Sequence, residues 1–145
     1  MEAIGIVVSG HGHFASGIMS DVELIIGKQE NTVAVDFPYG TSIDDLRKAL
    51  HAALDSLQHC EQILIATDLF HGSPFNEALM IALKQTRYDK ILYGVNVAML
   101  LTLFLDRNNG KIFTELINDC VQAGKEALGV FDVKTIVQEA EDDGF

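Results

Sequence analysis

Two segments of the 145-residue chain contain the candidate reactive side chains. In the first, His11 stands between Gly10 and Gly12, directly after a short apolar run. In the second, Asp68 directly follows another apolar run. A carboxylate beside an imidazole fixes the ring and stabilises the positive charge that develops when the other ring nitrogen attacks an electrophile. The sequence therefore predicts a nucleophilic histidine with an aspartate partner, if the fold brings the two segments together.

The residues after Asp68 predict the start of a helix that could bind an anion. Ser73 is a common N-cap residue and Pro74 a common first helical residue. The free amides at such a helix start attract negative charge. Histidine, carboxylate and anion site together indicate phosphoryl transfer through histidine. Because the sequence has no P-loop and no carboxylate cluster for magnesium, we expect a donor other than a nucleotide.

Alternating strand and helix patterns predict the framework that positions these residues. Short apolar segments predict strands at residues 3–8, 32–37, 62–67 and 90–95. Helical spacing of apolar residues predicts helices at residues 18–26, 46–57, 99–105 and 113–128, with another helix beginning at Ser73. This alternation predicts an α/β fold, a three-layer sandwich with four parallel strands in flavodoxin-like order. In that order the first and third strands are neighbours, so His11 can face Asp68.

The C-terminal part of the sequence predicts one more strand and a tail. Residues 131–137 suit a strand, which we expect to lie antiparallel at an edge of the sheet because no crossover helix precedes it. Residues 139–145 are acidic, and no regular structure is predicted for them. We therefore expect one phosphotransfer domain over residues 1–138, followed by an acidic tail.

Composition excludes several classes of function. A hydrophobic content of 48% with 21% charged residues indicates one soluble domain. The formal charge of −11 disfavours nucleic acid and anionic lipid as partners. No apolar stretch reaches a bilayer-spanning length and the N-terminus lacks signal-peptide features, so we expect a cytoplasmic protein without membrane insertion. Cys60 and Cys120 lack metal-ligand spacing and are predicted to be reduced.

These motifs resemble those of the IIA proteins of the mannose class (the mannose, fructose and sorbose family) of the bacterial phosphoenolpyruvate-dependent sugar phosphotransferase system. The matching segments occur in family order at residues 6–12, 27–31, 35–37, 67–70, 72–76 and 94–96. Two positions depart from the family pattern. His71 precedes Gly72 where the family usually has a second glycine, and Ala98 stands where the family often has proline.

The resemblance implies a function and a set of partners. It implies that His11 is phosphorylated and that Asp68 is its partner. Phosphate would come from the small histidine-phosphorylated carrier protein and leave for a IIB protein or domain, with the membrane subunits IIC and IID downstream. No cofactor is implied. The family also implies a homodimer in which the last strand is exchanged between subunits.

Further residues are expected to surround the reactive pair. Gly12, Gly72, Ser73 and Asn96 are candidates for binding phosphate or lining the site. The aromatic residues near the loops are candidates for core packing or for the rim that meets a partner protein: Phe14, Phe70 and Phe75. His13 and His71 are expected to border the site without taking part in the chemistry.

Two alternative functions remain open at this stage. A metal-binding module or metallohydrolase could use His11, His13, His71 and Asp68 as ligands, although two histidines one residue apart seldom reach the same ion from a tight turn. A sensor or binding domain could keep the fold without transferring phosphate, but the presence of both His11 and Asp68 argues against it. The sequence does not indicate which sugar the system transports.

Overall fold

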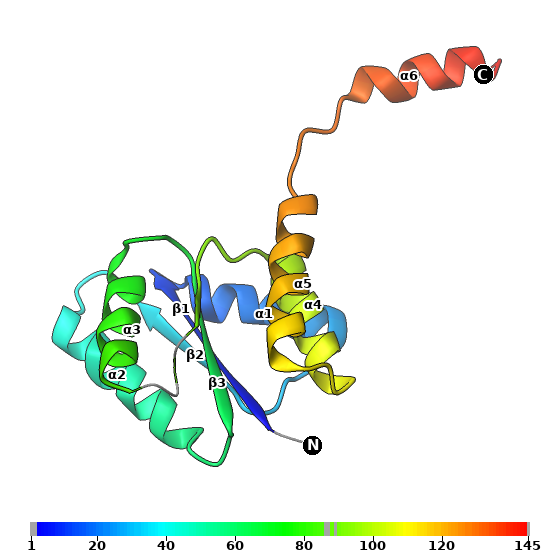
Figure 1. Cartoon of the computed structure of the whole chain (residues 1–145). Helices are drawn as coiled ribbons and strands as arrows, with labels where there is room; N and C mark the ends of the chain where they lie inside the picture. Colours follow the sequence, from blue (N-terminus) through cyan, green and yellow to red (C-terminus); the bar gives the residue numbers. More distant parts are fainter. Residues whose placement is uncertain (1–2, 86–87, 89, 145) are drawn as a thin grey trace.

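A parallel β-sheet forms the middle layer of the protein (Figure 1). The computed structural model describes residues 3–85, 88 and 90–144. Within them the sheet contains four strands in the order β2-β1-β3-β4. The strands are β1 (Ile4–His11), β2 (Thr32–Phe37), β3 (Gln62–Thr67) and β4 (Ile91–Leu92). The predicted α/β fold and its strand order are confirmed, although β4 is shorter than the predicted segment.

Helices cover both faces of this sheet (Figure 1). On one face lie α1 (Phe14–Ile26), α4 (Val97–Asn108) and α5 (Phe113–Glu126), and on the other lie α2 (Ile43–Ser56) and α3 (Ser73–Lys84). Successive residues of β1 belong to different cores, since Ile6 and Val8 pack under α1 and α4 whereas Val7 packs under α2. Burial on both faces explains why the strands are apolar almost throughout.

The strand register brings the two reactive segments to the same edge of the sheet. Ser9 of β1 pairs with Thr67 of β3, two residues before His11 and one residue before Asp68. Both residues are buried, and the side chain of each forms a hydrogen bond with the outer neighbouring strand, β2 for Ser9 and β4 for Thr67. The Ser9 hydroxyl donates to the Val35 carbonyl at 2.9 Å, and the Thr67 hydroxyl donates to the Leu92 carbonyl at 2.7 Å. These bonds tie all four strands together just below the candidate site.

The C-terminal segment is helical, so the strand predicted at residues 131–137 is wrong. Helix α6 (Val133–Asp142) begins after Asp132, whose carboxylate accepts from the Lys134 N–H at 2.9 Å. Its apolar residues recur at three- and four-residue spacing, which suits a helix better than a strand: Val133, Ile136, Val137 and Ala140. The helix also continues through residues 139–142, for which no structure was predicted.

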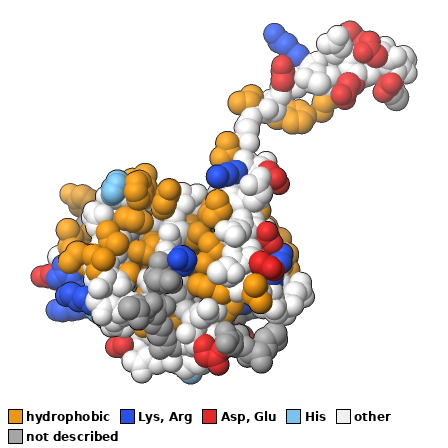
Figure 2. Space-filling view, in the orientation of Figure 1, with side chains coloured by type: hydrophobic (Ala, Val, Ile, Leu, Met, Phe, Trp, Pro, Cys, Tyr) orange, Lys and Arg blue, Asp and Glu red, His pale blue; other side chains and the backbone are white. Residues whose placement is uncertain are grey.

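Residues 128–142, which we call the C-terminal arm, extend away from the rest of the chain (Figure 1). No residue of α6 is buried, and Leu128, Val130 and Phe131 before it are exposed. Figure 2 shows hydrophobic side chains along the arm and on the face of the body below it. None of the helices in the part of the chain that the structure describes combines the length and the hydrophobicity that a bilayer-spanning helix requires.

Candidate active site

His11 and Asp68 are in direct contact at the carboxyl edge of the sheet. The Oδ2 atom of Asp68 lies 2.9 Å from the ring Nδ1 of His11 and also accepts the His11 backbone N–H at 2.9 Å. The His11 side chain is 44% exposed, whereas that of Asp68 is only 17% exposed. The pair therefore presents its imidazole to an incoming reactant and keeps its carboxylate behind the ring.

This geometry determines which ring nitrogen of His11 can react. A carboxylate can only accept hydrogen bonds, so Nδ1 carries the proton that it shares with Asp68. The other nitrogen, Nε2, is then the one with the free electron pair. The second oxygen of Asp68, Oδ1, is buried and has no hydrogen-bond partner among the described residues. The negative charge of Asp68 is therefore largely directed at His11.

The start of α3 lies against the His11 ring. A Cβ atom at Gly72 would stand 2.4 Å from Cε1 and 3.1 Å from Nε2 of His11, so only glycine allows this approach. Gly72 is also the N-cap of α3, and no side chain caps this helix. The prediction that Ser73 is the N-cap was wrong by one residue, because Ser73 is the first helical residue. The unpaired amides of the first turn of α3 thus begin beside Nε2.

Two further glycines shape the loop that carries His11. A Cβ at Gly10 would stand 2.4 Å from the Phe14 ring and 2.9 Å from Cγ of Asp68, so glycine lets both side chains close in on the end of β1. Gly12 has a φ of +58°, a left-handed conformation that glycine adopts readily. Its backbone exchanges hydrogen bonds of 2.8 and 3.1 Å with Phe37 of β2.

A second carboxylate at this edge, Asp36 of β2, lies in the matching segment 35–37, but no role was predicted for it from the sequence. It accepts the Ser16 N–H at 2.9 Å and the Ser16 hydroxyl at 2.6 Å, and it lies 3.3 Å from Nδ1 of His13. Partial burial would raise the pKa of Asp36, but the hydrogen bonds from Ser16 and His13 outweigh it and lower that pKa below its ordinary value. Asp36 is therefore ionised at neutral pH.

Aromatic residues line the rim beside the start of α3. The Phe70 ring centroid lies 3.7 Å from that of His71, 5.0 Å from that of Phe75 and 4.5 Å from that of Tyr93. Phe70 and Tyr93 are about half exposed, whereas Phe75 is buried beneath them. Sequence reasoning missed Tyr93, which comes from a different loop. Phe14, the third predicted rim residue, packs instead against the core below α1 and α4.

Asn96 lies in the loop after β4, and its side chain makes two structural hydrogen bonds. Its Oδ1 atom accepts the Met99 N–H at 3.0 Å and so caps α4, while its Nδ2 donates to the Gly124 carbonyl of α5 at 3.1 Å. Asn96 therefore joins α4 to α5 at the border of the site.

The residues considered for a metal site occupy three separate places. His11 bonds to Asp68, His13 bonds to Asp36, and His71 stacks on Phe70. Among the residues that the structure describes, no group of three or more His, Cys, Asp or Glu side chains could hold a metal ion. The geometry offers no support for the metal-binding alternative.

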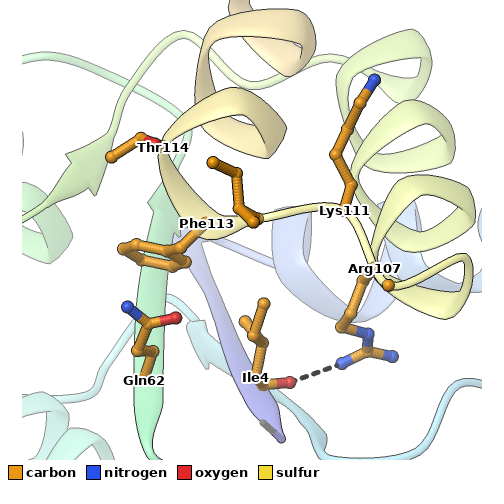
Figure 3. Close-up of a pocket in the computed structure, with 8 residues that line it drawn as sticks. Ile4, Gln62, Arg107, Lys111, Phe113 and Thr114 are labelled. Atoms are coloured by element: carbon orange, nitrogen blue, oxygen red, sulfur yellow. Dashed lines mark hydrogen bonds between the residues drawn. The ribbon is translucent and has the colours of Figure 1, made fainter. Parts of the chain in front are cut away.

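A cavity of about 440 Å³ lies at the opposite end of the sheet from His11 (Figure 3). In it the Arg107 guanidinium donates to the Ile4 carbonyl at 3.0 Å, and burial lowers the pKa of Arg107. Lys111 is paired with Asp106 and Asp119. Because Arg107 holds the beginning of β1 and Lys111 is neutralised by two carboxylates, we assign these side chains structural roles.

Comparison with known proteins identifies relatives over most of the chain. The family model described as "EIIA-man: PTS system fructose IIA component" matches residues 5–121. The mannose-specific EIIAB component of Escherichia coli K12 is 31% identical over 137 residues, which cover 94% of this chain. The chain spans only 42% of that relative's length.

Two other relatives match nearly from end to end. The fructose-specific EIIA component of Bacillus subtilis is 28% identical over 145 residues, which cover 97% of this chain and 98% of the relative. The crystal structure of a phosphotransferase-system EIIA component from Streptococcus agalactiae superposes with a TM-score of 0.78 at 34% identity. The superposed region covers 91% of this chain and 98% of the Streptococcus agalactiae chain.

Proposed function

The chain belongs to the EIIA-man family of phosphotransferase-system IIA components, and from this premise we propose that it carries a phosphoryl group on His11. The group arrives from a histidine-phosphorylated carrier protein and leaves for a IIB protein or domain. The protein is thus a phosphotransferase that works through a phosphohistidine intermediate. The observation that carries this proposal is the contact of His11 Nδ1 with Asp68, which leaves Nε2 beside the start of α3.

Phosphoryl transfer between the two histidines consumes no external proton and needs no cofactor. The electron pair of His11 Nε2 attacks the phosphorus of the donor phosphohistidine, and the new N–P bond forms as the donor's N–P bond breaks. The donor ring is protonated on its other nitrogen, as the phosphorylated His11 ring will be, so it leaves with the electrons of that bond as a neutral imidazole. His11 keeps the proton on Nδ1, so its ring becomes a phosphorylated imidazolium. Transfer to IIB repeats the step with His11 as the donor.

Asp68 and α3 stabilise opposite charges in this step. Asp68, bonded to Nδ1 at 2.9 Å, lies against the ring that becomes positive. The amides of the first turn of α3 carry no side-chain cap and can bind the negative phosphoryl oxygens next to Nε2. Gly72 lines the site, but its own N–H donates to the Leu69 carbonyl at 3.1 Å, so the N–H of Ser73 is the nearest amide of this anion site. Gly12 keeps the approach to the ring open. Charge stabilisation on both sides lowers the barrier in each direction.

The exposed aromatic rim supplies a docking surface for the two protein partners. Phe70 and Tyr93, with Leu69 beside them, are exposed and apolar next to the reactive histidine. Such anchors suit a small, rapidly reversible contact. The relatives are named for mannose, fructose and sorbose, so we propose a sugar uptake system as the setting, with membrane subunits IIC and IID downstream. The protein itself acts in the cytoplasm.

We also propose that two copies form a homodimer through the C-terminal arm. Strand β4 pairs with β3 on one side and lies at the edge of the described sheet on the other. An open groove of about 410 Å³ runs between β4 and α5 and is lined by Leu92, Met99, Ile117 and Val121, among others. The arm of a second copy, with its exposed apolar side chains, would cover this edge and its groove.

Incubation with phosphoenolpyruvate, the first enzyme of the system and the carrier protein tests the proposed function. We expect intact mass to increase by one phosphoryl group, which is lost in acid and retained in base. His11→Gln removes the acceptor and abolishes labelling, whereas the control His13→Gln is labelled like the wild type. A label that survives His11→Gln, or that maps to His13 or His71, contradicts the assignment of His11.

The role of Asp68 is tested with Asp68→Asn. The amide keeps the shape of the side chain but cannot stabilise an imidazolium by charge, so we expect the fold to persist and transfer to slow by at least about tenfold. Asp45→Asn is a suitable control because Asp45 bonds to Ser42 and not to His11. Unchanged transfer in Asp68→Asn rejects the pairing as a functional one.

A further inference from the structure

The N-terminus of α1 is capped by a residue of another strand. The N-cap residue His13 makes no side-chain cap hydrogen bond. Instead, Oδ1 of Asp36 in β2 accepts the N–H of Ser16 in the first turn of α1, at 2.9 Å. Oδ2 of Asp36 accepts the Ser16 hydroxyl at 2.6 Å and lies 3.3 Å from Nδ1 of His13. One carboxylate thus joins three groups within the first turn after the His11 loop.

The neighbouring backbone bonds place Asp36 directly behind this loop. Asp36 pairs with Gly10 in the β1–β2 register, and the next residue, Phe37, pairs with His11. Phe37 also exchanges two backbone hydrogen bonds with Gly12. The end of β2 therefore holds the chain on both sides of His11: by pairing before it, and through Gly12 and the Asp36 contacts after it.

His11 consequently lies between two carboxylates that act at different places. Asp68 contacts the ring and the N–H of His11 directly. Asp36 does not touch the ring, but it fixes the segment that leads from His11 into α1. The Asp36 side chain is only 22% exposed, so a docking protein meets His11 and His13 before it meets Asp36.

We propose that Asp36 is a positioning residue for phosphoryl transfer at His11. This inference rests on the proposed function. The attacking nitrogen must point at the phosphorus within a narrow range of distance and angle, and a loop free to move spends less time in that orientation. Asp36 restricts the loop at its helical end, as Asp68 restricts it at the ring. Its negative charge also occupies the N-terminus of α1, so the phosphoryl group meets free amides at α3 instead.

Single-turnover transfer from the phosphorylated carrier protein to Asp36→Ala tests the proposal. We expect the first-order rate constant to fall on the order of tenfold, while the carrier concentration giving half-maximal rate stays within about twofold, since Asp36 does not face the partner. Asp36→Asn keeps one acceptor oxygen for Ser16, so its transfer rate constant should fall less than that of Asp36→Ala. Asp36→Glu should restore part of the rate because it retains the charge.

Asp45→Ala is the matched control for a loss of stability alone. Asp45 also accepts hydrogen bonds at a helix start, in a capping box with Ser42 of α2, and its pKa is likewise lowered by those bonds. We expect Asp45→Ala to lower Tm yet to transfer phosphate at the wild-type rate, when both variants are assayed well below their Tm. A wild-type rate constant in Asp36→Ala, or an equal slowing in Asp45→Ala, overturns the proposal.

A measurement without a phosphate donor separates this proposal from the proposed function. The ¹⁵N chemical shifts of the His11 ring report its tautomer and its bond to Asp68. In Asp36→Ala we expect these shifts to move toward an exchanging mixture of tautomers, while Asp45→Ala keeps the wild-type pattern. Unmoved His11 shifts in Asp36→Ala contradict a positioning role, whether or not the chain can be phosphorylated. His13→Ala, which leaves both Ser16 bonds in place, should change the shifts only slightly.

Discussion

At the level of single residues, the site depends on how closely Gly72 approaches His11. The distances from a hypothetical Gly72 Cβ to the His11 ring, 2.4 Å to Cε1 and 3.1 Å to Nε2, are too short for any side chain. The same absence of a side chain brings the first amides of α3 next to the reactive nitrogen. Gly72 is therefore the residue through which α3 and His11 act on the same phosphoryl group.

Gly72→Ala is predicted to impair transfer without unfolding the chain. The added methyl must displace the His11 ring or the start of α3, and a shift of about 1 Å in a reacting group can cost up to a hundredfold in rate. We expect a fall in the transfer rate constant of between tenfold and about a hundredfold, measured by rapid quench. Circular dichroism should show wild-type helix content.

Gly17→Ala provides the control for this substitution. A Cβ at Gly17, within α1, meets nothing within 4 Å, so the methyl is accommodated. Alanine in a helix interior should stabilise the chain by about 0.5–1 kcal/mol and leave transfer unchanged. If Gly72→Ala transfers as fast as Gly17→Ala, the close contact between α3 and His11 has no role in the reaction.

At the level of helices and strands, the sequence was enough to predict both the first and third strands and their adjacency in the sheet. A buried parallel strand is an unbroken apolar run, and residues 62–67 contain no other pattern. Once strand and helix alternate, handedness rules leave few possible orders of strands. The contact between His11 and Asp68 follows from that order. His11 is the last residue of β1, Asp68 directly follows β3, and these two strands are neighbours.

The C-terminal segment was assigned wrongly because its residues suit both kinds of structure. Val133, Thr135, Ile136 and Val137 are β-branched and favour a strand when counted by type. Their spacing, together with Ala140 one turn further on, favours a helix, and Asp132 is a good N-cap. In a short segment without buried neighbours, type and spacing carry similar weight.

Two parts of the site could not be predicted because they join distant positions. Asp36 bonds to Ser16 across 20 positions, and Phe70 stacks with Tyr93 from a different loop. A cap supplied by another strand leaves no local signature, unlike the capping box of Ser42 and Asp45. Knowing that residues 36 and 10 are paired would have placed Asp36 beside the His11 loop.

Asn96→Ala is predicted to lower stability more than transfer. The substitution removes the cap of α4 and leaves the Gly124 carbonyl without its donor, which together should cost on the order of 1–3 kcal/mol. Urea denaturation measures this change. Asn108→Ala, an exposed position on the same helix, should change stability by less than about 0.5 kcal/mol. A loss of transfer in Asn96→Ala with unchanged stability would instead indicate a phosphate ligand.

At the level of the whole molecule, the C-terminal arm is predicted to hold a homodimer. Its exposed apolar residues would be stabilised by burial against a second copy. Light scattering at micromolar concentration should give the mass of a dimer. Truncation after Gly129 should shift the mass toward the monomer and reduce solubility, because the edge at β4 then stays uncovered.

A single substitution tests whether the apolar side chains of the arm, and not only its length, hold the dimer together. Ile136→Asp places a charge on the apolar side of α6, whereas Thr135→Asp places one at a neighbouring position outside that spacing. We expect only Ile136→Asp to weaken the dimer. A wild-type chain that is monomeric at micromolar concentration contradicts the dimer proposal as a whole.

The net charge of −11 predicts how a partner finds the site. A carrier protein with a basic patch is attracted over distances comparable to the Debye length, about 10 Å at 0.1 M salt. Raising the salt concentration from low to physiological should therefore reduce the second-order rate of phosphoryl transfer by about tenfold. Stopped-flow measurement at several salt concentrations gives this slope.

The aromatic rim should act at short range and respond differently to salt. Phe70 is 46% exposed and Tyr93 is 54% exposed, and the exposed faces of both rings are apolar. Phe70→Ala should speed dissociation of the carrier protein and lower the transfer rate at every salt concentration by the same factor, which leaves the slope unchanged. A wild-type rate that does not depend on salt shows that the acidic surface serves solubility, and that shape and apolar contact alone select the partner.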